Sequence, residues 1–391
     1  MDDNSLRESL SAACHWLVDI AQVKGETPPE GVRLRHAHTR WQGAIMGEYS
    51  VKDRLWGFFC PVWHTGQAVK ALVLANRVLG ENWLLAGARA GADFILNAQI
   101  NGAADPDAGL ILAYEDDPAK VNTSAVLEAL EGLLLLGDVT GEARYGEAAI
   151  AAARWVAAKA YLGDGLFVDS YDPAARSFAQ YRYGTRGRPL AEDAVLLEVA
   201  ARSDDARLRT IFLEVCERLL RDEDPPGNWI NYSPCDPVGG NLHPRHAYWW
   251  GRPLIAAWRE TGDRRYLACA LRCGEYYRNA QRRDGGLFRG TYRDFTTDSF
   301  GHATSGMACA MLLWLELDRA LPEPRFGSAF DRGLRHCLTM QFREVQDPNL
   351  RGCILEKVLA PDGTDRSPYH IRDLGTIFFV QALSLYLDRP R

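Results

Sequence analysis

The segment from residue 228 to residue 254 is the densest gathering of side chains capable of chemistry in this chain. Turn residues, among them Pro237, Gly239 and Gly240, lead there into a helical pattern whose first turns hold rings and cations. Such a helix start is poor core material but suits a sugar, because aromatic rings cover the apolar faces of a pyranose while Arg and His bind hydroxyls or a carboxylate. The candidate residues of this segment are Asn231, Tyr232, His243, Arg245, His246, Tyr248, Trp249, Trp250 and Arg252.

Histidines show the same bias, since seven of the nine lie in predicted long connections or in the first helical turn after them. One such histidine would be explained as a solvated loop residue, but seven on one face favour a site. Metal binding is the weaker explanation, because His243-Pro244-Arg245-His246 is too short and too cationic for a good chelate and no paired acid stands nearby. We therefore expect no metal and no cofactor. The seven are His36, His38, His64, His243, His246, His302 and His370.

Further candidates stand at the starts of other helical patterns. Asp193 and Asp298 are the acids among them and are the candidate catalytic carboxylates, beside His246 and His302. A helix N-cap alone would explain Asn122, Asp298 and Asp373 without any function. The substrate-binding candidates outside the first segment are Trp63, His64, Asn122, Arg186, Ser299, His370 and Arg372.

The charge of the chain limits the chemical class of the expected ligand. The net charge is -6, so the surface as a whole should not attract nucleic acid. Arg and His nevertheless gather at the candidate positions, which indicates that an anion binds there. A uronic acid fits best, because the same positions are rich in aromatic rings.

A repeated pattern indicates the elements that position these residues. Four segments share an acid, any residue, Arg and a large apolar residue, at intervals of 58 to 63 residues, and a looser copy, Glu81-Asn82-Trp83, precedes them at a similar interval. A near-constant interval is the mark of a structural repeat. The four segments are Glu142-Ala143-Arg144-Tyr145, Asp205-Ala206-Arg207-Leu208, Asp263-Arg264-Arg265-Tyr266 and Glu323-Pro324-Arg325-Phe326.

Each copy lies between two helical patterns, so the unit is a helix, a tight turn and a second helix that begins near the acid. Five such hairpins leave one unpaired helix at each end, residues 5–22 and 373–387. Together these would form a sixth hairpin and close a ring. The predicted fold is therefore all-α, an (α/α)6 toroid formed by a single domain over residues 1–391, with an open solenoid as the structural alternative.

The predicted connections alternate in length. Those inside hairpins are short, whereas those between hairpins are long, and connections this long are usually functional. All the long ones lead into the first helix of a hairpin, so they should emerge on one face of the ring and bring the candidate residues together. They cover roughly residues 23–62, 99–121, 161–189, 222–246, 281–300 and 341–370.

Targeting signals are absent from the pattern of the sequence. The first residues are acidic, without the basic start of a signal peptide, and no apolar run is long enough to span a membrane. The nine cysteines are scattered without a CxxC pair, which indicates reduced thiols. We expect a cytoplasmic protein without membrane or nucleic-acid partners, and a homo-oligomer is left open.

Two short runs resemble segments of the unsaturated glucuronyl and rhamnogalacturonyl hydrolases. In that family an Arg-Gly-Gln-x-Trp run precedes a Thr-Gly-Asp turn and a Tyr-Leu, and an Asp-Ser-Ser-Ala run precedes a Ser-Gly. The matching runs here are Trp250-Gly251-Arg252-Pro253-Leu254 with Thr261-Gly262-Asp263-Arg264-Arg265-Tyr266-Leu267, and Asp298-Ser299-Phe300-Gly301-His302-Ala303-Thr304-Ser305-Gly306.

The resemblance implies a site at the mouth of the ring and a catalytic acid near the start of the second or third hairpin. In the third hairpin Asp193, within Leu190-Ala191-Glu192-Asp193-Ala194, stands in the place of that acid. In the second hairpin Asn122-Thr123-Ser124 stands where an acid would be expected. This departure widens the expected activity to that of a general uronate-processing enzyme, similar to the exo-acting β-glucuronidases of the six-hairpin glycosidases.

The first functional hypothesis is a glycoside hydrolase that releases a terminal uronic acid, such as glucuronate or its unsaturated form, from an oligosaccharide. Asp193 would be the general acid or base and Asp298 the second carboxylate. The sugar carboxylate would be held by one of three arginines and the ring by three tryptophans. These are Arg245, Arg252 and Arg372, and Trp63, Trp249 and Trp250.

The second hypothesis is a lyase or uronyl epimerase on the same fold. Such an enzyme needs a base to remove the proton beside the carboxylate and a cation to stabilise the enolate. His246, His302 and Tyr248 could do this without a catalytic carboxylate. A non-catalytic sugar-binding ring is the third class.

Overall fold

All six predicted hairpins are present. The computed structural model describes residues 2–32, 38–115, 117–179, 187–298, 303–358 and 370–389, and twelve α-helices occur among them. The hairpins are α2 (Pro61–Leu79) with α3 (Asn82–Asn97), α4 (Thr123–Thr140) with α5 (Ala143–Lys159), α6 (Val195–Ser203) with α7 (Ala206–Asp222), α8 (His246–Thr261) with α9 (Arg264–Ala280), α10 (Thr304–Ala320) with α11 (Gly327–Thr339), and α12 (Leu374–Leu387) with α1 (Asp3–His15), which continues as a π-helical stretch over Trp16–Ala21.

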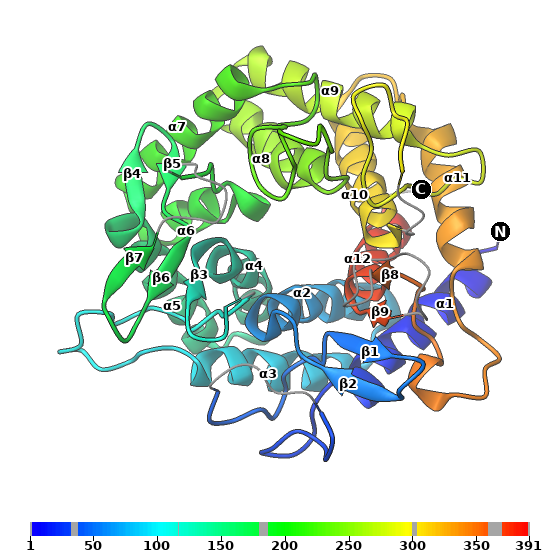
Figure 1. Ribbon diagram of the computed structural model, residues 1–391, viewed down its shortest axis with the longest axis horizontal. Coiled ribbons are helices and arrows are strands. Elements are labelled where there is room, and N and C mark those ends of the chain that lie inside the picture. Colours follow the sequence, from blue (N-terminus) through cyan, green and yellow to red (C-terminus); the bar gives the residue numbers. More distant parts are fainter. Residues whose placement is uncertain are drawn as a thin grey trace.

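The hairpins form a closed ring with two layers (Figure 1). The first helix of each hairpin lies in the inner layer, in the order α2, α4, α6, α8, α10 and α12. The last of these, α12, packs against α2. A short 3-10 turn before α6, η2 (Glu192–Ala194), contacts both α4 and α8. The N-terminal helix α1 packs against the C-terminal helix α12, as predicted. The ring is therefore an (α/α)6 toroid and not an open stack.

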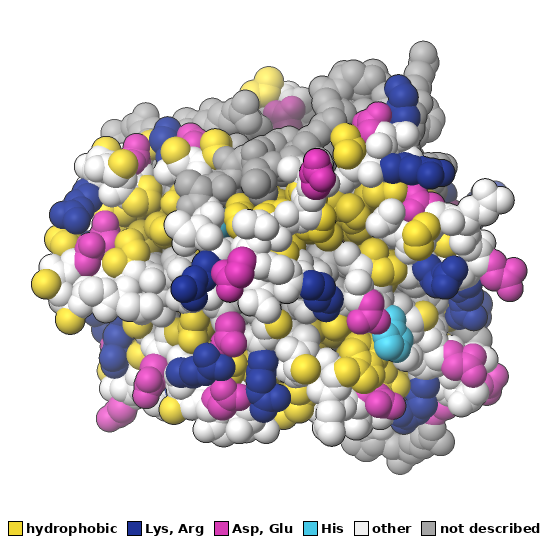
Figure 2. All heavy atoms as spheres, turned by 90° about the horizontal axis from the view of Figure 1, so that it is seen from below, with side chains coloured by type: hydrophobic (Ala, Val, Ile, Leu, Met, Phe, Trp, Pro, Cys, Tyr) yellow, Lys and Arg dark blue, Asp and Glu magenta, His cyan; other side chains and the backbone are white. Residues whose placement is uncertain are grey.

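The two layers differ in the way their helices are buried. In the inner layer every residue of α12 from Leu374 to Ser384 is buried, because this helix is covered on all sides. The outer helix α7 buries residues at three- and four-residue steps, such as Leu208, Phe212 and Cys216, and exposes its other face. Figure 2 shows basic and acidic side chains interspersed over one side of the ring.

The repeated sequence pattern corresponds to the turn between the two helices of a hairpin. Gly141 and Gly262 end the first helix in the left-handed conformation, which glycine adopts without strain. Asp205 and Asp263 then cap the second helix, each accepting a hydrogen bond from the backbone amide two residues further on. The fifth copy differs, because α11 begins only at Gly327, after the copy has ended.

Short strands in the long connections are the feature that the sequence pattern missed. At two or three residues each, they are too short to show alternating hydrophobicity. The four-stranded sheet, in the order β2-β1-β9-β8, joins the connection before α2 to the one before α12. The strands are β1 (Glu48–Ser50), β2 (Leu55–Gly57), β3 (Val121–Asn122), β4 (Tyr161–Gly163), β5 (Leu166–Phe167), β6 (Ser170–Asp172), β7 (Ser177–Ala179), β8 (Lys357–Val358) and β9 (His370–Arg372).

Close approach of α2 and α4 brings the polar residues of these two inner helices together. A Cβ atom added to Gly66 would lie 2.4 Å from the Cα atom of Ala129, and one added to Gly132 would lie 2.3 Å from the carbonyl oxygen of Gly66. Larger residues could not occupy these positions without separating the helices. The glycines therefore allow Lys70 on α2 to reach Glu131 on α4.

Candidate active site

The connections and the first turns of the inner helices enclose a cavity of about 850 Å³. Its wall is built from the start of α2, the start of α4, the segments around residues 169 and 188, the loop before α8 and the end of β9. Six residues singled out from the sequence line this cavity: Trp63, Asn122, His243, Arg245, Trp249 and Arg372.

Arg245 lies between two indole rings of the cavity wall. The centre of its guanidinium is 5.6 Å from the ring centroid of Trp63 and 5.1 Å from that of Trp249. His243 stacks in parallel on the Trp249 ring at 5.6 Å. The sequence therefore placed the aromatic and cationic part of the wall correctly in the turn before α8 and the first turns of α2 and α8.

Three buried donors of this wall find no hydrogen-bond partner within the described part of the chain: Nη1 of Arg245 and the indole nitrogens of Trp63 and Trp249. Arg245 is only 9% exposed. A buried donor without a partner costs free energy, so such groups are usually satisfied by a bound molecule or by water. This part of the wall is suited to a ligand that offers oxygen atoms and carries negative charge.

Arg372 approaches the cavity from β9. Its guanidinium lies 4.1 Å from the centroid of the Phe59 ring and makes an ion pair with Glu48, the residue directly opposite in β1. Glu48 neutralises part of its charge, so Arg372 is a weaker candidate than Arg245 for binding an anion.

Asn122 is both a helix cap and a residue of the cavity wall. Its side-chain oxygen accepts hydrogen bonds from the backbone amides of Ser124 and Ala125, and its amide nitrogen donates to Glu115. The capping explanation is therefore confirmed. Since both ends of the side chain already have partners, its contribution to a ligand is limited.

Two buried carboxyl groups of the cavity, Glu128 and Asp169, were not predicted from the sequence. Burial, and then the nearby charge of Glu192, raise the pKa of Glu128 well above its usual value. The described residues provide no hydrogen bond or ion pair to its carboxyl group. Burial likewise raises the pKa of Asp169. A single acid inside the apolar run Val126-Leu127-Glu128-Ala129-Leu130 was the signal that could have revealed Glu128.

Arg188 joins the acids on this side of the cavity. Its guanidinium lies 3.0 Å from Oε1 of Glu192 and 3.5 Å from Oδ2 of Asp169. Glu192 is 1% exposed, and burial raises its pKa to about 7. Arg188 is the cation of this acidic cluster, and it also lines the cavity.

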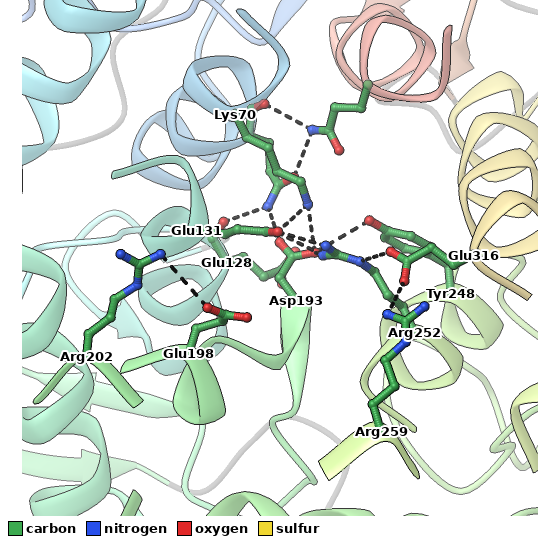
Figure 3. Close-up of polar contacts among 12 residues, drawn as sticks. Lys70, Glu128, Glu131, Asp193, Glu198, Arg202, Tyr248, Arg252, Arg259 and Glu316 are labelled. Atoms are coloured by element: carbon green, nitrogen blue, oxygen red, sulfur yellow. Dashed lines mark hydrogen bonds and ion pairs between the residues drawn. The ribbon is translucent and has the colours of Figure 1, made fainter. Parts of the chain in front are cut away.

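Asp193 belongs to a different cluster, an ion network between the inner helices (Figure 3). Its carboxylate lies 2.9 Å from Nζ of Lys70 on α2 and 2.7 Å from Nη1 of Arg252 on α8. Burial opposes ionisation, but the charges of Lys70 and Arg252 prevail and hold the pKa of Asp193 well below its usual value. These are the surroundings of a permanent carboxylate rather than of a proton donor.

Arg252 is occupied by protein carboxylates. It makes two hydrogen bonds of 2.7 and 2.8 Å to Glu131 on α4, one to Asp193, and one of 2.8 Å to Glu316 on α10 (Figure 3). The hydroxyl of Tyr248 lies 3.4 Å from Asp193. Neither Arg252, Tyr248 nor Asp193 is among the residues that line the cavity. Arg252, predicted to bind the sugar carboxylate, is therefore an ion-pair partner of protein carboxylates within the ring.

His64 and His246 also lie outside the lining, and both are completely buried. Nδ1 of His64 is 2.8 Å from Oδ1 of Asp373, so Asp373 binds this ring instead of capping α12. His246 contacts the Cys235 sulfur at 3.0 Å and the carbonyl oxygen of Ser233 at 3.1 Å. Burial lowers the pKa of His246 to about 3, so its ring is neutral.

Trp250 and Asp298 were predicted at the site as well. Trp250 is fully buried and stacks on His246, because consecutive residues of a helix point in different directions and only Trp249 faces the cavity. Asp298 is exposed, and it lies well before the start of α10, so it does not cap that helix. Five predicted positions or side chains lie outside the described residues, namely His36, Arg186, Ser299, His302 and the side chain of His370.

The nine cysteines are all buried and unbonded to one another. Across the described ranges, no cluster of three or more metal-ligating side chains occurs. In the same ranges, no helix has both the length and the apolar character needed to cross a bilayer.

Comparison with known proteins shows likeness at the level of the fold. No family model and no curated protein sequence matches the chain. An unsaturated glucuronyl hydrolase specific for heparin superposes with a TM-score of 0.70 at 13% identity, covering 98% of this chain and 97% of its own. A cellobiose 2-epimerase from Bacillus thermoamylovorans gives 0.66 at 10% identity, covering 99% and 100%, and a D-mannose isomerase gives 0.68 at 10% identity, covering 98% of both chains. These similarities confirm the (α/α)6 toroid.

Proposed function

We propose that the protein is a carbohydrate-active enzyme, a glycoside hydrolase that releases a terminal uronic acid or its unsaturated form from an oligosaccharide. The observation that carries the proposal is the buried Arg245 guanidinium on the cavity wall, with a free Nη1 donor between two indole rings whose own donors have no partner in the described chain. Proteins of the same fold that are named as hydrolases, epimerases and isomerases of sugars support the broader class.

The wall around Arg245 matches the two kinds of surface that a uronate presents. Trp63 and Trp249 offer ring faces and indole N–H donors to the pyranose, and Arg245 offers a charge-assisted hydrogen bond to the carboxylate. In the low dielectric of a buried site this contact discriminates strongly between an acidic and a neutral sugar.

Glu128 takes the role of proton donor in this proposal. A general acid must hold its proton at working pH, and a buried carboxyl group with a raised pKa does so. Asp169 is the second buried carboxyl group of the cavity wall and takes the role predicted from the sequence for Asp298. The separation of two such groups sets the stereochemical course of hydrolysis.

The test is a panel of uronic-acid oligosaccharides and matched neutral glycosides, with product analysis. A released saturated uronate, or the loss of ultraviolet absorbance of an unsaturated one, supports the proposal. Equal turnover of neutral and acidic substrates would overturn the selectivity. A gain of absorbance would instead show elimination.

A uronyl epimerase or lyase is the second candidate, favoured by His243. This ring lines the cavity, and burial holds its pKa well below the usual value, so it is neutral and able to accept a proton. His243 takes the role of candidate base that was predicted for His246 and Tyr248, because these two residues do not line the cavity. Incubation in heavy water distinguishes the two candidates, since proton abstraction exchanges deuterium into the recovered sugar beside its carboxylate and hydrolysis does not.

A further inference from the structure

We infer that Glu192 is a positioning residue that keeps the proton on Glu128, and that Arg188 is the counter-ion that sets how many protons the cluster retains. The inference rests on the proposed function, because it concerns the proton donor of the same site. Glu192 does not line the cavity, so it acts on the chemistry only through neighbours that do, Glu128 and Arg188.

Arg188 contacts two buried carboxyl groups, and a third, that of Glu128 on α4, lines the same cavity as Arg188 and belongs to a helix that packs against η2. Glu128, Asp169 and Glu192 are 5%, 2% and 1% exposed, and Arg188 contacts the last two. Oε2 of Glu192 is buried without a hydrogen-bond partner among the residues described. Within the described ranges Arg188 is the cation that contacts these acids, so three ionised carboxylates would leave uncompensated negative charge in a nearly dry region, which is costly. At least one of the three therefore retains its proton.

Glu128 is the group that retains it. Asp169 and Glu192 each have Arg188 as an ion-pair partner, whereas the Glu128 carboxyl has none in the described ranges. The charge of Arg188 lowers the pKa of Glu128, but burial and the acids Glu192, Asp193 and Glu115 act in the opposite direction and prevail. The cations nearest to Asp193 are already bound in their own network with Glu131 and Glu316.

The backbone of η2 separates the two acidic clusters. Asp193 and Ala194 have φ values of 54° and 55°, a left-handed conformation that residues with a Cβ rarely adopt. This kink directs Glu192 to Arg188 and its neighbour Asp193 to Lys70 and Arg252. Such a strained backbone is retained only where the surrounding structure requires it. Here it gives two adjacent acids different partners, which supports a functional need for Glu192 to lie beside Arg188.

The experiment is a pH titration of the Glu128 carboxyl by NMR on protein with 13C-labelled glutamate, in the absence of substrate. The Glu128→Gln variant assigns the signal. In Glu192→Gln we expect the midpoint of Glu128 to fall by about 1 pH unit or more, because the largest like-charge neighbour is gone. Glu198→Gln on the exposed face of α6 is the matched control and leaves the midpoint unchanged. An unchanged midpoint in Glu192→Gln overturns the inference.

A second variant protects the test against a folding defect. Asp169→Asn should shift the midpoint in the same direction, since Arg188 then has one carboxylate fewer to neutralise. With an active enzyme, the alkaline limb of the rate profile should move to lower pH in Glu192→Gln, whereas Asp169→Asn is read by the NMR midpoint alone because Asp169 belongs to the proposed catalytic pair. A shifted midpoint in a protein inactive on uronates refutes only the proposed function, and an unshifted midpoint in an active enzyme refutes only the role of Glu192.

Discussion

Arg245 is the residue on which selectivity for acidic sugars depends. Replacing it by alanine removes a buried donor that has no hydrogen-bond partner among the described residues, so the carboxylate of the substrate loses its charge-assisted contact. We expect kcat/KM for uronates to fall about a hundredfold or more, as for the loss of a charged hydrogen bond of a few kcal/mol. Steady-state kinetics on matched uronate and neutral glycosides measures the effect.

Arg245→Lys should recover only part of the activity, because an ammonium group cannot make the paired contact of a guanidinium. Arg259→Ala, on the half-exposed side of α8, is the control and should leave uronate turnover unchanged. A loss of neutral and acidic turnover in equal proportion in Arg245→Ala would contradict the assignment.

Glu128→Gln tests the proton donor. The amide has nearly the same shape but cannot donate a proton to the leaving oxygen, so kcat should fall by about 10²- to 10⁴-fold while the substrate still binds. The rate on substrates with activated leaving groups, which need little protonation, should fall much less. If both classes of substrate lose the same fraction of kcat, Glu128 is not the general acid.

The same variant should stabilise the protein. The pKa of Glu128 is higher in the folded protein than in the unfolded chain. The protonated carboxyl group therefore contributes fully to the free energy of unfolding below the unfolded pKa, and this contribution is lost as the pH rises through the folded pKa. Glu128→Gln removes this loss. Urea unfolding should show the variant to be more stable than the wild type at neutral pH, with the difference shrinking toward acid pH; an equal difference at both pH values would contradict the shift.

The residues that the sequence could reveal are those whose type is unusual for their place. Arg245 and Trp249 stood out in a turn and a helix start, and both line the cavity. Trp250 stood out equally but is core, because sequence proximity does not say which side of a helix faces the cavity. Glu128 was not predicted because a lone acid in an apolar helix could equally lie on an exposed face. It can be recognised as buried only once the helix is known to be covered on all sides.

At the scale of elements, the ion network holds the inner helices to one another. Lys70, Glu131, Asp193, Arg252 and Glu316 come from α2, α4, η2, α8 and α10 (Figure 3). Breaking a buried ion pair by removing one partner is strongly destabilising, because it leaves uncompensated charge. These residues therefore fix the distances between helices that carry the cavity wall.

Arg252→Ala should lower the free energy of unfolding by about 3–5 kcal/mol. Arg259→Ala, whose side chain is 49% exposed and touches only Glu316 of the same network, should cost less than about 1 kcal/mol. The folded pKa of Asp193 is lowered, so the contribution of the network is present above the unfolded pKa and is lost as the pH falls below it. Chemical denaturation at neutral and acid pH measures both effects, and equal costs for the two arginines would contradict the network.

The elements themselves were largely predictable. An acid two residues before Arg caps the second helix in two hairpins, at Asp205 and Asp263, and Glu142 holds the same N-cap position without a capping hydrogen bond, so the repeat in the sequence marks the hairpin turns. The strands were not predictable, because β1 and β9 acquire their pairing from a contact between residues more than 300 positions apart. This pairing is what places Arg372 beside Glu48 at the cavity.

At the scale of the whole molecule, closure of the ring follows from two helices that have no partner next to them in sequence. The packing of α1 on α12 makes the ends of the chain one more hairpin, without the covalent turn that the other five possess (Figure 1). The inner helix α12 has no exposed face over most of its length, so it depends on both α1 and its inner neighbours for burial. The ring should therefore tolerate a new position for its ends but not the loss of a hairpin.

A circular permutant tests this directly. We join residue 389 to residue 2 through a short Gly/Ser linker and open the chain between Pro322 and Glu323, in the exposed turn between α10 and α11. Because each helix keeps its neighbours, the permutant should unfold cooperatively, with a free energy of unfolding within a few kcal/mol of the parent. Deleting α12 from the parent chain should instead expose the apolar sides of α2 and α10 and abolish cooperative unfolding. Calorimetry and light scattering distinguish these outcomes. A permutant that aggregates like the deletion variant would mean that the closing contact between α1 and α12 is too weak to hold the ring.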